Sequence, residues 1–131
     1  MPKSIRNIKI LIVEDDKDIC ELYSTAFMRE GFKVLKAMEG KSAIEKYQQK
    51  NPDIMLLDIM MPGVDGYAVL KEVRKQHSKY VPVIMLTNLD MGHFNRHETV
   101  DNVDDYLIKS NYTPSEIVER TKEIMRLNKI L

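Results

Sequence analysis

Short apolar runs alternate along this chain with longer segments in which apolar residues recur every three or four positions. Three of the runs are almost unbroken, at Ile8 to Val13, Ile54 to Leu57 and Val81 to Leu86. Unbroken runs of this kind are typical of strands in a parallel sheet that is covered on both faces. Lys33 to Ala37 and Val103 to Ile108 predict two further strands, and the polar ends of the Lys33 to Ala37 segment place it near an edge.

Capping residues mark the helices in the first half of the chain. Asp16 or a neighbour can cap a helix that ends before Gly31, because a glycine is common just after a helix end. A second helix is predicted from Gly40 to Gln49, and it is broken before Pro52. Asp65 then caps a third helix.

Two more helices are predicted in the second half of the chain. The segment from Met91 to Asp101 has only a thin apolar stripe, and we predict a helix there. Thr113, Pro114 and Glu116 form a capping box with proline at the first helical position, so the last helix begins there. Strands and helices thus alternate, which indicates one α/β domain with a parallel sheet between two helical layers.

The residues that follow the predicted strands share a chemical character. Glu14 and Asp15 follow the first strand, Asp58 the third, Thr87 the fourth and Lys109 the fifth. Because the carboxyl ends of parallel strands lie at one edge of a sheet, these side chains should meet in one shallow cleft. Clustered carboxylates stay ionised only beside a cation, and a few oxygen ligands suit Mg²⁺, which also binds phosphate. A phosphoryl group on Asp58 would supply that phosphate, within reach of Lys109 and Thr87.

The order and spacing of these segments resemble the receiver domain of bacterial two-component response regulators. The resemblance is carried by IKILIVEDD, LLDIMMPGVDG, IMLTN and DDYLIK, and it covers nearly the whole chain. It implies a flavodoxin-like, doubly wound α/β fold with a five-stranded parallel sheet of order 2-1-3-4-5, five helices and a single receiver domain over residues 1–131. It also implies a phosphorylation-activated switch in signal transduction.

The resemblance assigns roles to the acidic residues. Asp58 is similar to the phosphoacceptor, which takes a phosphoryl group from the phosphohistidine of a sensor histidine kinase or a phosphotransfer protein. Asp15 is similar to the direct Mg²⁺ ligand and Glu14 to a second acid that acts through water. Met60 matches the residue whose backbone carbonyl is a further metal ligand.

Three further residues would make the site a switch. Lys109 resembles the paired cation, Thr87 the hydroxyl that closes on the phosphoryl group, and Tyr106 the aromatic residue whose position reports activation. The face formed by the fourth helix, the fifth strand and the last helix would then change and act on a downstream effector protein or domain. By this resemblance the chain is not an enzyme, beyond its own Mg²⁺-dependent phosphorylation and dephosphorylation.

The chain departs from the family pattern at three positions. Asn88 replaces a small residue and would narrow access to Asp58, and Asn102 stands where glycine is common. Ser110 replaces the proline that usually follows the lysine in a cis bond. A cis bond before a residue other than proline costs ~3 kcal/mol, so we predict a trans Lys109–Ser110 bond and a rearranged loop.

Composition agrees with a cytoplasmic signalling domain. The 20 basic and 20 acidic residues give a net charge of zero, which argues against direct binding of nucleic acid or of an anionic membrane. No apolar run approaches the length of a membrane span, and a signal-peptide pattern is absent. Cys20 is the single cysteine, so no internal disulfide forms, and its apolar surroundings predict a buried thiol.

Other metal and phosphate chemistries fit these residues less well. An EF-hand would need an oxygen ligand at Cys20 and a following glycine. A phosphatase with an Asp-x-Asp nucleophile pair would need a general acid where Met60 stands. His93 and His97 lie four residues apart, but no acidic or cysteine partner completes a metal set, which favours surface histidines.

Two alternative functions stay open at this point. One is a degenerate receiver that binds partners without phosphotransfer, although the acids, Thr87 and Lys109 favour phosphorylation. The other is a flavodoxin-like cofactor protein, although the carboxylates of Glu14, Asp15 and Asp16 would repel a flavin phosphate.

Overall fold

The computed structural model describes residues 2–75, 79–88 and 103–131 of the chain. One sheet contains five strands in the order β2-β1-β3-β4-β5, and all neighbouring strands are parallel. The strands are β1 (Lys9–Val13), β2 (Lys33–Ala37), β3 (Ile54–Asp58), β4 (Val83–Thr87) and β5 (Asp105–Ile108). The helices described are α1 (Lys17–Arg29), α2 (Gly40–Lys50), α3 (Gly66–Arg74) and α5 (Pro114–Leu127), with short 3₁₀ helices η1 (Ile5–Asn7) and η3 (Lys109–Asn111).

The predicted fold class and strand order are confirmed. β2 lies at one edge of the sheet, as its polar ends predict, and β5 lies at the other edge. The helix predicted from Met91 to Asp101 lies outside the described residues, as do His93, His97 and Asn102. No helix in the described ranges is long and apolar enough to cross a membrane.

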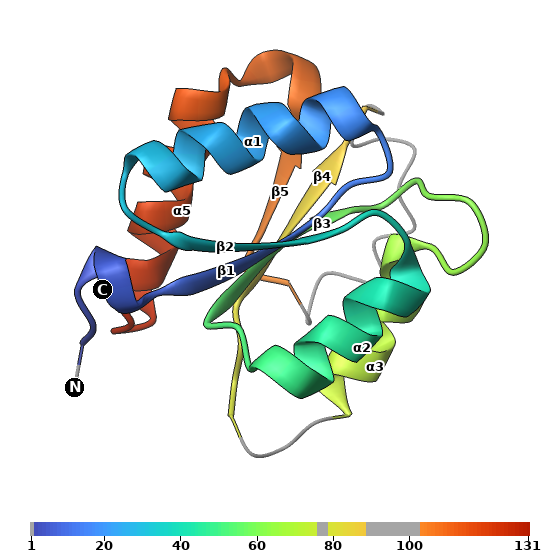
Figure 1. The fold of residues 1–131 in the computed structure, drawn as a ribbon, viewed down its shortest axis with the longest axis horizontal. Helices are drawn as coiled ribbons and strands as arrows, with labels where there is room; N and C mark the ends of the chain where they lie inside the picture. The colour runs from blue at the N-terminus through green and yellow to red at the C-terminus, as the bar shows by residue number, and fades with distance from the viewer. Residues whose placement is uncertain (1, 76–78, 89–102) are drawn as a thin grey trace.

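The described helices cover both faces of the sheet (Figure 1). α1 and α5 pack on one face and α2 and α3 on the other, so the sheet is the middle one of three layers. Ile10 and Ile12 of β1 belong to the core beneath α1 and α5, whereas Leu11 and Val13 belong to the core beneath α2 and α3. Neighbouring residues of the strand thus enter opposite cores, which is why its apolar run is unbroken. Cys20 is buried in the first core, as predicted.

α1, α3 and α5 begin directly after the predicted capping residues. The Asp16 carboxylate accepts hydrogen bonds from two amides in the first turn of α1 at 3.0 and 3.1 Å. The Asp65 carboxylate accepts one from the Ala68 amide at 3.0 Å, and Thr113 and Glu116 form the capping box of α5. Each cap satisfies backbone donors that have no partner inside the helix.

Gly31 ends α1 in the left-handed conformation, with a φ angle of 102°. The Gly31 amide donates to the Met28 carbonyl at 3.0 Å, and the Phe32 amide donates to the Phe27 carbonyl at 3.2 Å. This pair of bonds is the usual termination of a helix by glycine. It turns the chain back toward the start of β2.

The start of α3 lies against the backbone that carries Asp58. A Cβ atom on Gly66 would lie 2.4 Å from the Asp58 carbonyl oxygen, so only glycine fits there. The Gly66 amide donates to the Ile59 carbonyl at 3.0 Å, and the Ile59 amide donates to the Leu86 carbonyl of β4 at 3.0 Å. The carboxyl end of β3 is therefore held between α3 and β4.

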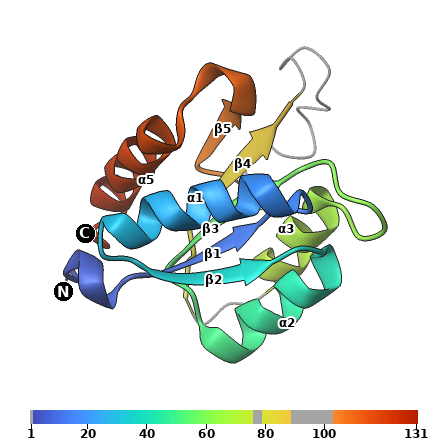
Figure 2. The same cartoon turned by 45° about the horizontal axis from the view of Figure 1, so that its top comes forward.

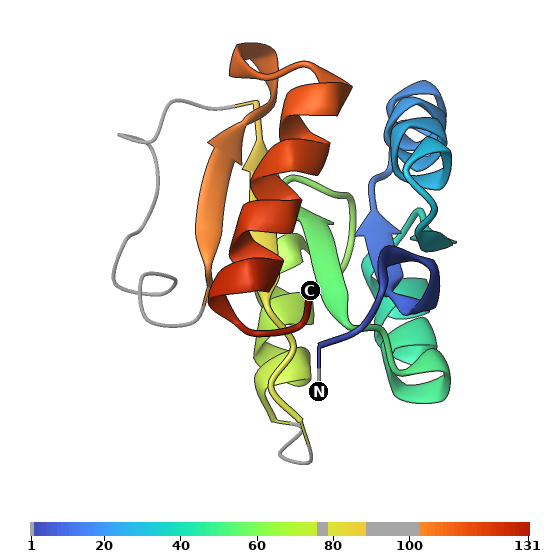
Figure 3. The same cartoon turned by 90° about the vertical axis from the view of Figure 1, so that its left-hand side faces the viewer.

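A buried carboxylate holds the opposite end of β3. Asp53 is 1% exposed, and it accepts hydrogen bonds from Lys79 at 2.7 Å, Lys3 at 3.0 Å and the Lys9 amide at 2.9 Å. Burial disfavours the charged form of this carboxyl, but these donors outweigh burial and hold its pKa below the usual value. The Lys3 amide also donates to the Ile130 carbonyl at 2.7 Å, so the two ends of the chain lie close together (Figure 3).

Candidate functional site

The carboxyl edge of the sheet brings together acids from two neighbouring strands. Glu14 and Asp15 follow β1, and Asp58 is the last residue of β3. One carboxylate oxygen from each of these acids lies within 4.8 Å of the others. Glu14 is 0% exposed and Asp58 is 2% exposed, whereas Asp15 is exposed to solvent. The predicted convergence of these acids is confirmed, and Asp15 is the member that solvent reaches.

Lys109 supplies a cation to this acid cluster. Its ammonium group forms one ion pair with Glu14 and another with Asp58 at 3.3 Å, and its side chain is 7% exposed. No other basic side chain of the described residues pairs with these acids. The positive charge of Lys109 is therefore smaller than the negative charge that surrounds it.

The peptide bond after Lys109 is trans, as predicted. None of the described peptide bonds is cis, and Lys109–Asn111 form the short helix η3. The Tyr112 amide donates to the Lys109 carbonyl at 3.3 Å, which closes this turn. The loop between β5 and α5 thus accommodates Ser110 in place of proline, and Lys109 still reaches Asp58.

The groups around the Asp58 carboxyl raise its pKa. Burial raises the pKa of this carboxyl to about 8, and the hydrogen bond and negative charge of Glu14 act in the same direction. The Lys109 ammonium opposes this shift, and Asp15 adds to it. A cation among these carboxylates would favour their charged forms. The cluster therefore fits a small divalent ion that prefers oxygen ligands, such as Mg²⁺.

The turn after β3 brings the backbone of Met60 to the cluster. The Met60 amide donates to the Asp58 carboxylate at 3.3 Å, while the Met60 side chain is exposed. Its carbonyl as a metal ligand stays a prediction. Asp16 caps α1 instead of joining the cluster, and the described chain adds no histidine, cysteine or further acid to it. Asn88 is exposed at the end of β4, and its effect on access to Asp58 stays a prediction.

Thr87 and Tyr106 lie on the two strands beyond β3. Thr87 is the last residue of β4 and is fully buried, and it follows Leu86, which pairs with Asp58 in the sheet. Tyr106 pairs with Met85 and packs against the core beneath α2 and α3. Thr87 therefore lies at the edge that carries the acid cluster, and Tyr106 lies farther into the sheet. The switch roles of both residues stay predictions.

Comparison with known proteins agrees with this arrangement. The family described as the response regulator receiver domain matches residues 10–122. The alkaline phosphatase synthesis transcriptional regulatory protein PhoP of Bacillus subtilis is 35% identical over 131 residues, covering 95% of this chain and 51% of PhoP. The regulatory protein VanRc of Enterococcus gallinarum is 35% identical over 125 residues, covering 90% of this chain and 50% of VanRc. The chain thus spans about half the length of these relatives.

Solved structures show the same likeness. The receiver domain of Francisella response regulator 1452 matches with a TM-score of 0.81 and 33% identity, over 93% of this chain and 99% of that one. The chemotaxis protein CheY4 of Vibrio cholerae matches with a TM-score of 0.81 and 25% identity, over 89% of this chain and 98% of that one. From the fold, the acid cluster and these matches, we conclude that the chain belongs to the receiver domain family of two-component response regulators.

Proposed function

We propose that this receiver is a phosphorylation-activated switch in which Asp58 is the phosphoacceptor. The supporting observation is a buried carboxylate at the end of β3, beside Glu14, Asp15 and Lys109. An oxygen of Asp58 would attack the phosphorus of a phosphohistidine on a sensor histidine kinase or a phosphotransfer protein. The new O–P bond replaces the N–P bond, and the electron pair of the broken bond stays on the imidazole nitrogen.

The acid cluster is also the proposed binding site for Mg²⁺. Asp15 and Asp58 would be direct ligands, with the Met60 carbonyl as a third and Glu14 acting through water. When bound, the ion would neutralise charge on the phosphoryl oxygens during transfer. The donor set supports this assignment, because its carboxylate oxygens lie within 4.8 Å of one another. Lys109, whose ammonium lies 3.3 Å from Asp58, would contact an oxygen of the attached phosphoryl group.

The proposed output works through Thr87 and Tyr106. A phosphoryl group adds negative charge and acceptor oxygens, so the Thr87 hydroxyl would gain a contact that exists only in that state. Thr87 would move toward Asp58, and Tyr106 would take the space that Thr87 leaves. The face formed by the fourth helix, β5 and α5 would then bind a downstream effector. In this proposal the protein acts in the cytoplasm and catalyses no reaction beyond its own phosphorylation and dephosphorylation.

Intact-mass measurement after incubation with Mg²⁺ and acetyl phosphate tests the phosphoacceptor. The wild type should gain the mass of one phosphoryl group, and Asp58→Asn should gain none. Asp53→Asn is the matched control, because Asp53 is similarly buried at the other end of the same strand and should leave the gain intact. A full gain in Asp58→Asn would refute the assignment. No gain in the wild type would favour a receiver that binds partners without phosphotransfer.

Asp15→Asn tests the metal role separately. This variant should bind Mg²⁺ more weakly and should not be phosphorylated, although Asp58 is intact. Asp16→Asn is its control, because Asp16 caps α1 and asparagine caps helices equally well. The metal assignment is wrong if Asp15→Asn keeps both Mg²⁺ binding and phosphorylation.

Amide chemical shifts, measured before and after addition of beryllofluoride, test the output. The changes should extend from Asp58 to Thr87, Tyr106 and the surface of α5. Changes confined to the immediate surroundings of Asp58 would count against a switch.

A further inference from the structure

A pocket of about 300 Å³ opens between α1, β2 and α2, at the edge of the sheet formed by β2. The ribbon shows β2 running between these two helices (Figures 1 and 2). One lysine from each of the three elements lines the pocket, namely Lys17, Lys36 and Lys46, together with one acid, Glu21. The net charge of these four side chains is positive in a chain whose total net charge is zero.

The inner part of the pocket is apolar. Cys20 and Ala37 line it and are 2% and 3% exposed, so they form its floor, and Met38 lies beside them with 42% exposure. The pocket thus combines an apolar floor with a rim of ammonium groups. This combination fits a ligand that has an apolar body and a negatively charged end, since both parts can then be contacted at once.

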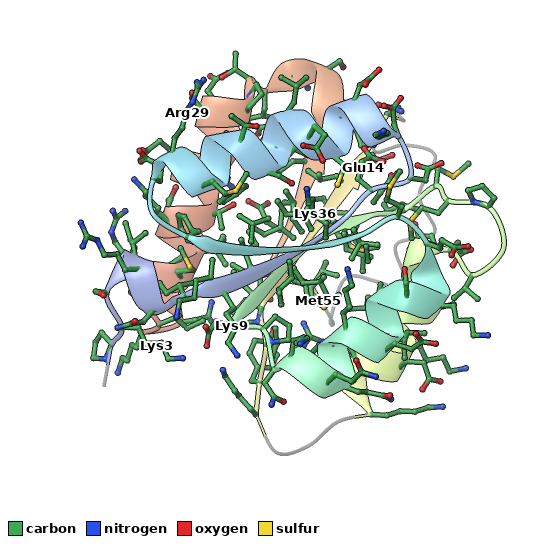
Figure 4. All side chains as sticks on the ribbon, in the orientation of Figure 1. Lys3, Lys9, Glu14, Arg29, Lys36 and Met55 are labelled. Carbon is green, nitrogen blue, oxygen red and sulfur yellow. The ribbon has the colours of Figure 1, made fainter. Side chains whose placement is uncertain are left out.

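Lys36 and Lys46 already have polar partners, but their ammonium groups keep N–H donors for a ligand. The Lys36 ammonium lies 2.9 Å from the Glu21 carboxylate, and the Lys46 ammonium donates to the Lys36 carbonyl. An ammonium group has three donors, so each of these lysines keeps donors for a ligand. Figure 4 labels Lys36, which lies on β2 between the two helices. The acid at the rim is therefore already neutralised by a rim lysine.

The side-chain ammonium of Lys17 forms no hydrogen bond or ion pair with another described residue. It is the first residue of α1, where the helix dipole makes a positive charge unfavourable. Its charge therefore does not stabilise the helix. Since its side chain lines the pocket, its ammonium group is available to a negatively charged ligand.

We propose that this pocket binds a small organic anion, a carboxylate or phosphate ester whose charged end meets the lysine rim and whose apolar body lies on Ala37 and Met38. The pocket is separate from the acid cluster, which attracts cations and repels anions. It is nevertheless linked to that cluster, because the Glu14 amide donates to the Ala37 carbonyl at 3.0 Å. The proposal goes beyond the proposed phosphorylation and does not depend on it.

The test is a titration of the ¹⁵N-labelled protein with phenyl phosphate, without Mg²⁺, followed by amide chemical shifts. Phenol supplies the apolar body alone, and inorganic phosphate supplies the charge alone. Phenyl phosphate should shift the amides of residues around the pocket, such as Lys17, Ala37 and Ser42, and should bind more tightly than either comparator. Benzoate tests whether a carboxylate serves as well as a phosphate, in which case it should shift the same amides. If benzoate shifts none of them, the ligand is restricted to phosphate esters.

Lys17→Met is the decisive variant, because methionine keeps the apolar stem and removes only a charge that has no described partner. It should weaken phenyl phosphate binding about tenfold, the effect of losing one charge-assisted hydrogen bond. Lys50→Met is the matched control, since it removes a lysine from the end of α2, outside the pocket, and should leave the affinity unchanged.

Four results would overturn the proposal. Phenol binding as tight as that of phenyl phosphate would make the pocket a neutral apolar site. Amide shifts that lie away from the pocket, or no shifts at all, would show that the anion does not bind there. Equal weakening of binding by Lys17→Met and Lys50→Met would indicate a general effect of net charge.

Discussion

The two ends of β3 carry the same kind of residue in opposite electrostatic situations. Asp53 precedes the strand and Asp58 ends it, and they are 1% and 2% exposed. Asp53 accepts hydrogen bonds from two lysine side chains and a backbone amide, and its pKa is held below the usual value. Asp58 lies beside two other acids and one lysine, and its pKa is raised to about 8.

Burial raises the pKa of both carboxyls, and the partners decide whether this effect is outweighed, as at Asp53, or strengthened, as at Asp58. Donors outnumber acids around Asp53, which makes its charge a source of stability. Around Asp58 the two neighbouring acids add to the cost of burial, and Lys109 and the Met60 amide do not outweigh it. The negative charge of Asp58 therefore lowers the stability of the fold until a further cation binds or the charge is removed. The fold thus holds one end of its central strand with a carboxylate that three donors stabilise, and it carries a carboxylate crowded by other acids at the opposite end.

Removing the charge of Asp53 should have the largest effect on stability. We expect Asp53→Asn to lower the free energy of unfolding by about 2 kcal/mol, since two ammonium groups and an amide lose a charged acceptor. Asp58→Asn should instead raise it by about 1 kcal/mol in Mg²⁺-free buffer, since it relieves repulsion. Urea unfolding of the wild type and both variants measures these changes in the free energy of unfolding. Changes of the same sign would remove the contrast between the two ends.

Mg²⁺ should stabilise the protein through one end of the strand alone. At a free concentration ten times the dissociation constant, we expect a gain of about 1.4 kcal/mol for the wild type. Asp53→Asn should keep this gain, and Asp58→Asn should lose most of it. Thermal unfolding with and without Mg²⁺ measures the effect. An equal gain in stability for the wild type, Asp53→Asn and Asp58→Asn would show that Mg²⁺ binds at another site.

The contribution of Asp53 should disappear in acid. Because its pKa is lowered in the folded state, this contribution is complete above the unfolded pKa and is lost as the pH falls through the folded value. The stability difference between wild type and Asp53→Asn should therefore narrow by about 1 kcal/mol or more between about pH 5 and pH 2. Urea unfolding across this range checks it, and a difference that stays constant would contradict the role of the charge.

The individual lysines around Asp53 should have the smallest effects. Lys3 and Lys79 are 44% and 47% exposed, so solvent weakens each ion pair. We expect Lys3→Met and Lys79→Met each to cost about 0.5 kcal/mol. The double variant should cost more than the sum, because either lysine partly compensates for loss of the other. A strictly additive result would show that the two lysines act independently.

The acid end of β3 could be predicted from the sequence, and the other end could not. Asp58 directly follows an unbroken apolar run, and the parallel topology places Glu14, Asp15 and Lys109 at the same edge. The partners of Asp53 leave no such signal. Lys3 lies 50 residues before it and Lys79 lies 26 residues after it, outside any strand or helix described.

The loop after β5 also has one feature that the sequence predicts and one that it does not. The absence of a proline at Ser110 was enough to predict the trans bond, because the energetic preference is local. The short helix η3 that brings Lys109 to the acids was not predicted, since it depends on where β5 ends and α5 begins. Capping residues placed the helix starts well for the same local reason, as Asp16, Asp65 and Thr113 show.

The close approach of Gly66 to Asp58 has a mechanical consequence. The carbonyl of Asp58 has no room to move toward α3, and the next amide is bonded to β4. The main chain beneath the carboxylate is thus held from two sides, so we expect a change at the carboxylate to shift neighbouring side chains and loops more than this backbone. A residue without a side chain thereby limits the directions in which the carboxyl end of β3 can move.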